Sequence, residues 1–187
     1  MAHAIALAKH FGNVAGLYAR DSFVVLRNFI SKEAAGTITE QAHRGCKTRV
    51  VQNAISWTEI GFAPGSLVHR IPELDEVKDL IRQATGHSGP YTSHTWANLY
   101  EAGEFIPWHR DSDGEIQLLL SLQSPPPARG GELLLGRPPK IAPLRLEPGD
   151  AVLFSARTLD HSTTALVPVP DGSAVQRLVA SIRFYMT

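Results

Sequence analysis

Hydrophobic positions change their spacing about halfway along the chain. Up to residue 90, apolar residues recur three and four positions apart, which is typical of helices that bury one face. The expected helices are one near the N-terminus (Ile5, Ala8, Val14, Leu17, Tyr18), one from the capping residue Ser31 to Arg44 and Gly45, and one from Pro72 to Thr85 and Gly86. The run Phe23–Leu26 predicts a short buried strand. Residues 47–67 have no clean period, and we expect an irregular loop there.

Beyond Tyr91, short apolar runs alternate with turns that contain glycine or proline. The expected strands are Thr92–Tyr100, Gln117–Gln123, Glu132–Leu135, Leu144–Leu146, Ala151–Phe154, Thr163–Val169 and Val175–Tyr185. Short strands at this spacing favour a sandwich, jelly roll or barrel. We therefore predict a mainly β protein with flanking helices. It should form a single domain, in which residues 1–90 give helical support and a substrate loop and residues 91–187 form the β core.

The composition is that of an ordinary globular protein. Hydrophobic residues make up 43% of the chain, and 18 Lys and Arg balance 18 Asp and Glu. Without net charge, nothing draws the whole molecule to nucleic acid or to a membrane surface. Cys46 is the only cysteine, which excludes an intrachain disulfide and paired-cysteine metal sites. We see neither a signal peptide nor an apolar stretch of about 18 residues, and expect a cytoplasmic protein.

Two histidines and an aspartate form a candidate metal site. His109 and Asp111 are two positions apart where a strand gives way to a loop, so both side chains can point to the same side. His161 follows the turn at residues 148–150 and the apolar strand after it. Taken alone, a histidine in either position is more often a surface or structural residue than a metal ligand. Together they offer two imidazoles and one carboxylate, the facial triad of non-haem Fe(II) oxygenases, which leaves positions open for substrate and dioxygen.

The last strand and residues 96–100 present polar side chains on one face each. Alternation places Arg177, Val179, Ser181, Arg183 and Tyr185 on one face of the last strand, and Leu178, Ala180, Ile182 and Phe184 on the other. An arginine among apolar neighbours needs an anionic partner, either a ligand carboxylate or an Asp or Glu. Trp96, Asn98 and Tyr100 also share one side, and the Tyr100 hydroxyl either donates a hydrogen bond to a ligand or lies at the rim of the core.

The order of these motifs resembles that of a known superfamily. Residues 98–111 contain a tyrosine, a glycine and then His-x-Asp, residues 130–133 read Gly-Gly-Glu-Leu, and the Pro-Gly-Asp turn at 148–150 leads to His161 and Arg177. This succession is similar to that of the Fe(II)/2-oxoglutarate-dependent oxygenases of the prolyl-hydroxylase-like superfamily, over roughly residues 20–187. The resemblance implies a double-stranded β-helix, a jelly-roll or cupin-like core, and a dioxygenase that uses Fe(II), 2-oxoglutarate and dioxygen.

The resemblance also implies roles for single residues. His109, Asp111 and His161 would bind iron, Arg177 the distal carboxylate of 2-oxoglutarate, and Tyr100 would donate a hydrogen bond to that cosubstrate. An aspartate at position 111 implies oxygenation, because related halogenases have Ala or Gly there.

Arg183 has two possible roles under the same resemblance. The interval from His161 to Arg177 is 177 − 161 = 16 positions, longer than is usual in the family. Arg183 is therefore the alternative arginine for 2-oxoglutarate. If Arg177 binds the cosubstrate, Arg183 on the same face can meet the substrate.

The expected reaction is hydroxylation, or another oxidation, of an unactivated C–H bond in a small molecule such as an amino acid or a specialised metabolite. The expected substrate contacts are Arg183, Asn98, Trp96 and Trp57, together with Gln52, Asn53 and Arg70 near the expected loop. Two alternatives stay open: a peptidyl or protein prolyl hydroxylase, and a non-catalytic metal-binding β-barrel module. The sequence specifies no oligomeric state.

Overall fold

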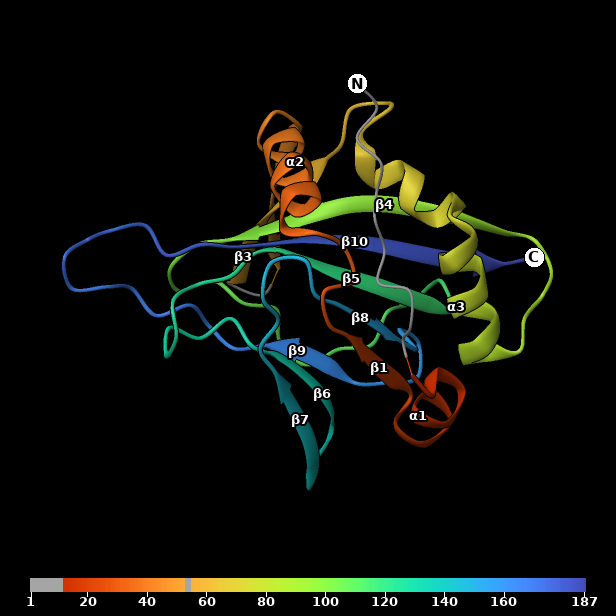
Figure 1. The fold of residues 1–187 in the computed structure, drawn as a ribbon. Coiled ribbons are helices and arrows are strands. Elements are labelled where there is room, and N and C mark those ends of the chain that lie inside the picture. Colours follow the sequence, from red (N-terminus) through yellow and green to blue (C-terminus); the bar gives the residue numbers. More distant parts are fainter. Residues whose placement is uncertain (1–11, 53–54) are drawn as a thin grey trace.

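Residues 12–52 and 55–187 are described by the computed structural model, and they form two antiparallel sheets with helices packed outside (Figure 1). The larger sheet contains, in spatial order, β1 (Phe23–Leu26), β8 (Ala151–Phe154), β5 (Ile116–Gln123), β10 (Arg177–Met186), β4 (Tyr91–Tyr100), β3 (Ile55–Gly61) and β2 (Cys46–Gln52). The smaller sheet contains β7 (Lys140–Leu144), β6 (Leu133–Arg137) and β9 (His161–Thr163). The helices are α1 (Val14–Asp21), α2 (Lys32–His43), the 3-10 helix Leu67–Glu73 and α3 (Asp75–Thr85).

The central strands of the larger sheet are buried on both faces. On one face, side chains of β10 such as Ile182 and Phe184 pack with Ile38 of α2 and Leu80 of α3. On the other face, Val179 and its neighbours pack against the smaller sheet. That second core contains Trp57, Tyr100, Leu119, Leu133, Leu135, Val152, Phe154 and Val179. The arrangement confirms the predicted mainly β fold with flanking helices.

Local sequence signals explain where the helices begin and end. The Ser31 side chain accepts a hydrogen bond from the Ala34 amide (3.1 Å), as expected of an N-cap. Gly86 ends α3 in the left-handed conformation (φ 74°). The N-terminal helix begins at Val14 in the described residues, and Ile5 and Ala8 lie outside them. Pro72 was expected in the first turn of α3 but belongs to the 3-10 helix, because extended Leu74 (ψ 137°) separates the two.

The expectation of an irregular loop over residues 47–67 was wrong. Strands β2 and β3 form a hairpin that extends the larger sheet, with Val50 paired to Trp57 and Thr48 to Glu59. Strand β2 lies at the sheet edge and exposes almost all its side chains, so its sequence has no inside-outside alternation.

Two strands of the smaller sheet also differ from the expected ranges. Strand β7 ends at Leu144, where the expected strand Leu144–Leu146 would begin. Strand β9 ends at Thr163, where the expected strand Thr163–Val169 would begin, because the next residues form hydrogen bonds with loops. The amide of Thr164 donates to the Glu132 carbonyl, and that of Leu166 donates to the Glu104 carbonyl.

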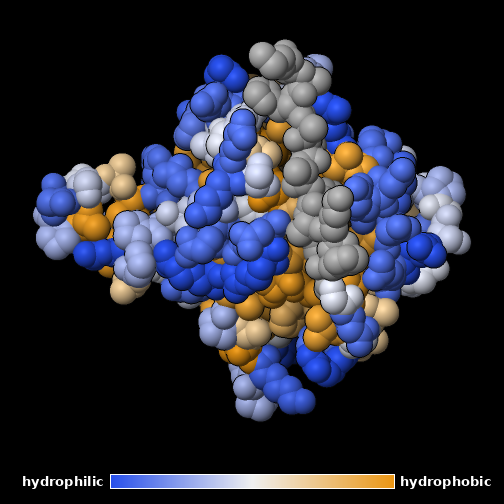
Figure 2. All heavy atoms as spheres, in the orientation of Figure 1, coloured by the Kyte–Doolittle hydropathy of each residue, from blue (hydrophilic) through white to orange (hydrophobic). Residues whose placement is uncertain are grey.

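The helical side of the molecule is polar on the outside. Figure 2 shows hydrophilic residues over the outward sides of α2 and α3, with hydrophobic residues gathered toward the centre of the view. Within residues 12–52 and 55–187, no helix has both the length and the hydrophobicity needed to cross a bilayer.

Candidate metal centre and cosubstrate pocket

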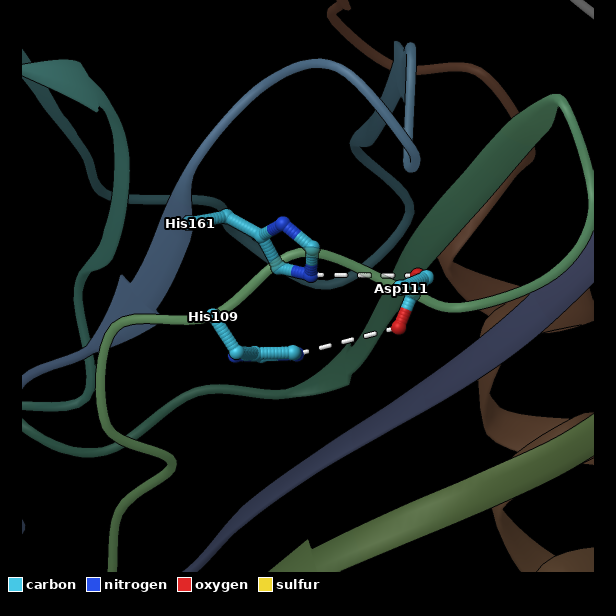
Figure 3. Close-up of side chains that lie close together, drawn as sticks. All are labelled: His109, Asp111 and His161. Atoms are coloured by element: carbon cyan, nitrogen blue, oxygen red, sulfur yellow. Dashed lines mark ion pairs between the residues drawn. The ribbon is translucent and has the colours of Figure 1, made fainter.

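His109, Asp111 and His161 converge at one end of the space between the two sheets. His161 begins β9, and the other two lie on the loop after β4 (Figure 3). One ligand atom from each residue lies within 4.8 Å of the others. Nε2 of His109 is 3.8 Å from Asp111 Oδ1, and Nε2 of His161 is 3.9 Å from Asp111 Oδ2. Two nitrogens and one carboxylate can thus reach a common cation.

The main chain fixes which imidazole nitrogen of each histidine is free. His109 Nδ1 is 2.8 Å from the Pro107 carbonyl oxygen, and His161 Nδ1 is 3.0 Å from that of Leu159. A carbonyl can only accept, so each Nδ1 carries the proton and each Nε2 presents its lone pair to the centre. Both rings therefore have the tautomer that a metal ligand requires.

His161 is also held in its neutral form. Burial, and to a smaller extent the neighbouring His109, lower its pKa to about 4, against the hydrogen bond to Leu159 and the charge of Asp111, which raise it. A neutral imidazole is the ligand form, so at neutral pH no proton has to leave His161 before a metal binds.

Backbone hydrogen bonds hold the triad in place. The amide of His109 donates to the His161 carbonyl and the amide of His161 donates back, both at 3.0 Å. The Asp111 amide donates to the Ala156 carbonyl at 3.0 Å. The metal-ligand loop is thereby attached to the β8–β9 connection, which explains how residues far apart in sequence meet.

A cavity of about 540 Å³ opens in front of the triad, and Arg177 lies in its wall. Arg177 is 5% exposed, and its guanidinium carbon is 5.2 Å from the centre of the Tyr100 ring. Burial lowers the pKa of Arg177 from 12.5, and burial raises that of Tyr100 to about 12. At neutral pH the pair therefore offers a cation and a neutral hydroxyl donor to an anion.

Unsatisfied polar atoms gather around this cavity. Among the described residues, the buried side-chain atoms without a hydrogen-bond partner are Asn98 Oδ1, Asp111 Oδ2, Arg177 Nη1 and Ser181 Oγ. The first three residues line the cavity, and Ser181 shares the β10 face of Arg177. Buried polar groups are normally paired, so their concentration here indicates a ligand site.

The Gly-Gly-Glu-Leu motif makes room for Arg177. A Cβ at Gly131 would come within 3.2 Å of Arg177 Cδ and 2.8 Å of Leu166 Cδ2, and φ is +77°. Only glycine fits both the conformation and the space. Gly131 therefore acts on packing beside the arginine, while Leu133 of the same motif lines the cavity.

Arg183 contacts the triad directly. Its Nη2 lies 2.7 Å from Asp111 Oδ2, although that oxygen accepts no hydrogen bond of good geometry. Its other donors reach Asp113 Oδ1 (2.6 Å) and Gln117 Oε1 (3.0 and 3.2 Å), and Trp96 lies under the guanidinium at 4.9 Å. Arg183 was expected to bind the substrate, but its guanidinium already binds Asp111, Asp113 and Gln117.

Comparisons with known proteins find the likeness in structure alone. No protein-family model matches the chain, and no curated protein matches it. A 2OG-Fe(II) oxygenase family oxidoreductase from Burkholderia pseudomallei superposes with a TM-score of 0.76 at 15% identity, covering 97% of this chain and 94% of that one. A Pseudomonas putida prolyl-4-hydroxylase gives 0.76 at 16% identity, covering 93% and 97%. The non-heme alpha ketoglutarate-dependent epimerase SnoN from nogalamycin biosynthesis gives 0.72 at 18% identity, covering 92% and 81%.

The chain has the 2-oxoglutarate oxygenase fold. The expected double-stranded β-helix is confirmed by these structures and by the two-sheet topology.

Within this oxygenase fold, most of the residues predicted from sequence meet at one cavity. Its lining includes the triad, Tyr100, Arg177, Arg183, Asn98, Trp96, Trp57 and Gln52. Arg70 does not line it, since it lies in the 3-10 helix, and Asn53 lies outside the described residues. The roles of these residues stay predictions.

Several cavity residues were missed from the sequence, among them the polar residues Glu59 and Gln117. Glu59 is two positions from Trp57 and therefore on the same strand face, a signal that was hidden because β3 was not expected. Gln117 begins an expected strand, but its inward direction depends on pairing with Arg183 of β10.

Proposed function

We propose that this protein is an Fe(II)- and 2-oxoglutarate-dependent oxygenase that hydroxylates an unactivated C–H bond of a small molecule. The observation that carries the proposal is one cavity with a two-histidine, one-carboxylate triad and a buried arginine whose Nη1 has no partner. Either feature alone has structural explanations. Their combination matches a metal ion together with a dicarboxylate.

The residues present fit both groups. His109, Asp111 and His161 supply the nitrogen and oxygen ligands that suit ferrous iron and leave coordination positions open. Arg177 can hold the distal carboxylate of 2-oxoglutarate through charge-assisted hydrogen bonds, with Tyr100 donating a further one. Placing an anion there also relieves the cost of a buried unpaired donor.

When bound, Fe(II) and 2-oxoglutarate supply the oxidising chemistry, in which dioxygen and the cosubstrate become succinate, carbon dioxide and one hydroxyl oxygen on the substrate. The protein holds the reacting groups in register and excludes water. Leu119, Leu133 and Phe154 form the apolar part of the lining near the triad. The hydrogen bonds of both Nδ1 atoms keep the ligand nitrogens aimed inward.

A peptidyl prolyl hydroxylase is the second candidate. Prolyl hydroxylases are among the similar solved structures, including one from Trichoplax adhaerens in complex with a peptide fragment (TM-score 0.72, 17% identity, covering 93% of this chain and 88% of that one). A single domain with balanced charge favours a small molecule. Stimulation of succinate release by proline-containing peptides, and not by free amino acids or other metabolites, would favour the second candidate.

Anaerobic titration of the Fe(II) protein with 2-oxoglutarate tests the proposal. Chelation gives a weak visible metal-to-ligand charge-transfer band, which we expect in the wild type and not in His161→Ala. Arg177→Ala should bind iron but require far more 2-oxoglutarate to reach the same absorbance. Iron binding without any such band in the wild type would contradict the oxygenase and favour a non-catalytic metal-binding module.

A further inference from the structure

The positive charges around the cavity already have partners or a proposed ligand. Arg183 is paired with Asp111 and Asp113, and its side chain is 14% exposed. Arg110 forms an ion pair with Asp160 at 3.1 Å. Arg177 lies beside Tyr100, where the proposed cosubstrate carboxylate would neutralise it. No cation lining the cavity is left to attract an acidic substrate.

One negative charge in the cavity wall has no such partner. Glu59 on β3 forms no ion pair with any described residue, and its only polar side-chain contact is the Trp57 indole N–H, 3.4 Å from Oε1. The other lining carboxylate, Asp111, belongs to the triad. A carboxylate in a partly enclosed, aromatic wall favours a cationic partner, because water screens the attraction only weakly there.

A second acceptor lies beside Glu59. Asn98 on β4 is directly opposite Glu59 in the strand register, so both side chains project into the cavity. Asn98 is 6% exposed, and its Oδ1 is buried without a hydrogen-bond partner. A carboxylate and an amide oxygen side by side form a site for a group that donates several hydrogen bonds.

The rest of the wall is aromatic. The chain contains three tryptophans, and all of them, Trp57, Trp96 and Trp108, line this cavity. Arg183 lies over the Trp96 ring at 4.9 Å and His94 stacks on the same ring at 5.2 Å, so Trp96 already has protein partners. Trp57 lies next to Glu59, and Trp108 is 44% exposed at the cavity. Indole surfaces hold hydrocarbon and attract cations.

We propose that the cavity selects a substrate that carries a protonated amine. Glu59 and Asn98 receive its N–H groups, and its hydrocarbon part lies against the indoles of Trp57 and Trp108. The inference rests on the proposed function, since it names the class of substrate that the oxygenase takes. It replaces Arg183, whose donors are engaged, with Glu59 as the residue that recognises substrate charge.

Binding of three probes with the same ring and different head groups tests this inference. Benzylamine, benzyl alcohol and benzoate are titrated into the Zn(II)-loaded protein, with and without 2-oxoglutarate, and tryptophan fluorescence reports cavity binding. In the wild type we expect benzylamine to bind at least about tenfold more tightly than the alcohol. Glu59→Gln should remove this preference, and Glu59→Lys should transfer it to benzoate. Glu40→Gln, on the exposed side of α2, is the matched control and should behave as wild type.

The outcomes separate this inference from the proposed function. The inference is overturned if the wild type binds benzylamine and benzyl alcohol equally, or binds neither. It is also overturned if Glu59→Gln keeps the preference for the amine. Neither result affects 2-oxoglutarate binding, which Glu59→Gln should retain at wild-type strength. Failure of the wild type to bind 2-oxoglutarate would contradict the proposed function instead, while an amine preference seen without cosubstrate would still stand.

Discussion

The two faces of β10 differ in how completely their side chains are satisfied. Toward the helices, Leu178, Ala180, Ile182 and Phe184 are each 0% exposed and belong to the apolar core. Toward the cavity, Arg177 and Ser181 are as deeply buried, yet each has a polar atom without a partner. Apolar burial stabilises a fold, and an unpaired polar atom destabilises it. One strand thus provides stability on one face and binding capacity on the other.

The largest effect on stability is expected on the helix face. Phe184→Ala removes a wholly buried ring that packs edge-to-face on Tyr91 at 5.2 Å, and should lower the free energy of unfolding by about 3–5 kcal/mol. Urea unfolding followed by circular dichroism measures the change. The fraction that stays folded should bind metal as the wild type does. A decrease of less than about 1 kcal/mol in the free energy of unfolding would mean that the helix face of β10 stabilises the fold no more than the cavity face does.

The reverse pattern is expected on the cavity face. Arg177→Met should weaken 2-oxoglutarate binding to the Zn(II) protein by about 100-fold, or about 2.7 kcal/mol, because the charge-assisted bonds to a carboxylate are lost. Its stability should equal or exceed that of the wild type, because a buried charged group whose Nη1 has no hydrogen-bond partner is removed. Calorimetric titration and urea unfolding give the two numbers. Destabilisation with unchanged 2-oxoglutarate affinity would show that Arg177 is structural.

Arg183 lies on the cavity face of β10, and we expect it to affect metal binding through its ion pair with Asp111. Arg183→Met frees the carboxylate from the ion pair at 2.7 Å and should weaken Co(II) binding by about 10- to 100-fold, the usual effect of losing a group that orients a metal ligand. Arg183→Lys should recover part of the affinity. Asp113→Asn, which touches Arg183 and none of the metal ligands, should have a smaller effect. Equal Co(II) affinity in Arg183→Met and wild type would show that Arg183 does not contribute to metal binding.

The smallest effect is expected at Asp150, away from both faces of β10. Burial alone would raise its pKa, but hydrogen bonds from the Asn28 amide, the Arg27 guanidinium and the Glu147 amide outweigh it and hold the pKa below 3.8. The ionised form is therefore favoured by folding, and its contribution is complete above the unfolded pKa and lost as pH falls through the folded one.

Asp150→Asn should accordingly cost about 1–2 kcal/mol at neutral pH. The difference from wild type should shrink as the pH falls below about 4. Urea unfolding over a pH series measures it. A difference that is independent of pH would show that the carboxylate charge has no part in the turn.

The sequence predicted those features that depend on chemistry and on alternation within one element. The separation of His109 and Asp111, the two faces of β10 and the Ser31 cap each follow from a few neighbouring residues. The edge position of β2 does not, because a strand exposed on both sides has no hydrophobic pattern. The pairing of Arg183 with Asp111 and Gln117 likewise depends on which strands become neighbours, and no local pattern contains that information.

The reciprocal backbone hydrogen bonds between His109 and His161 have a consequence for metal choice. They set the spacing of two ligand residues before any ion arrives, so binding restricts few remaining torsion angles and costs little conformational entropy. A cation that demands a different separation has to break main-chain bonds of the smaller sheet to obtain it. Among ions with similar ligand preferences, the rigidity of the backbone that holds the ligands therefore determines selectivity more than the strength of the donor atoms does.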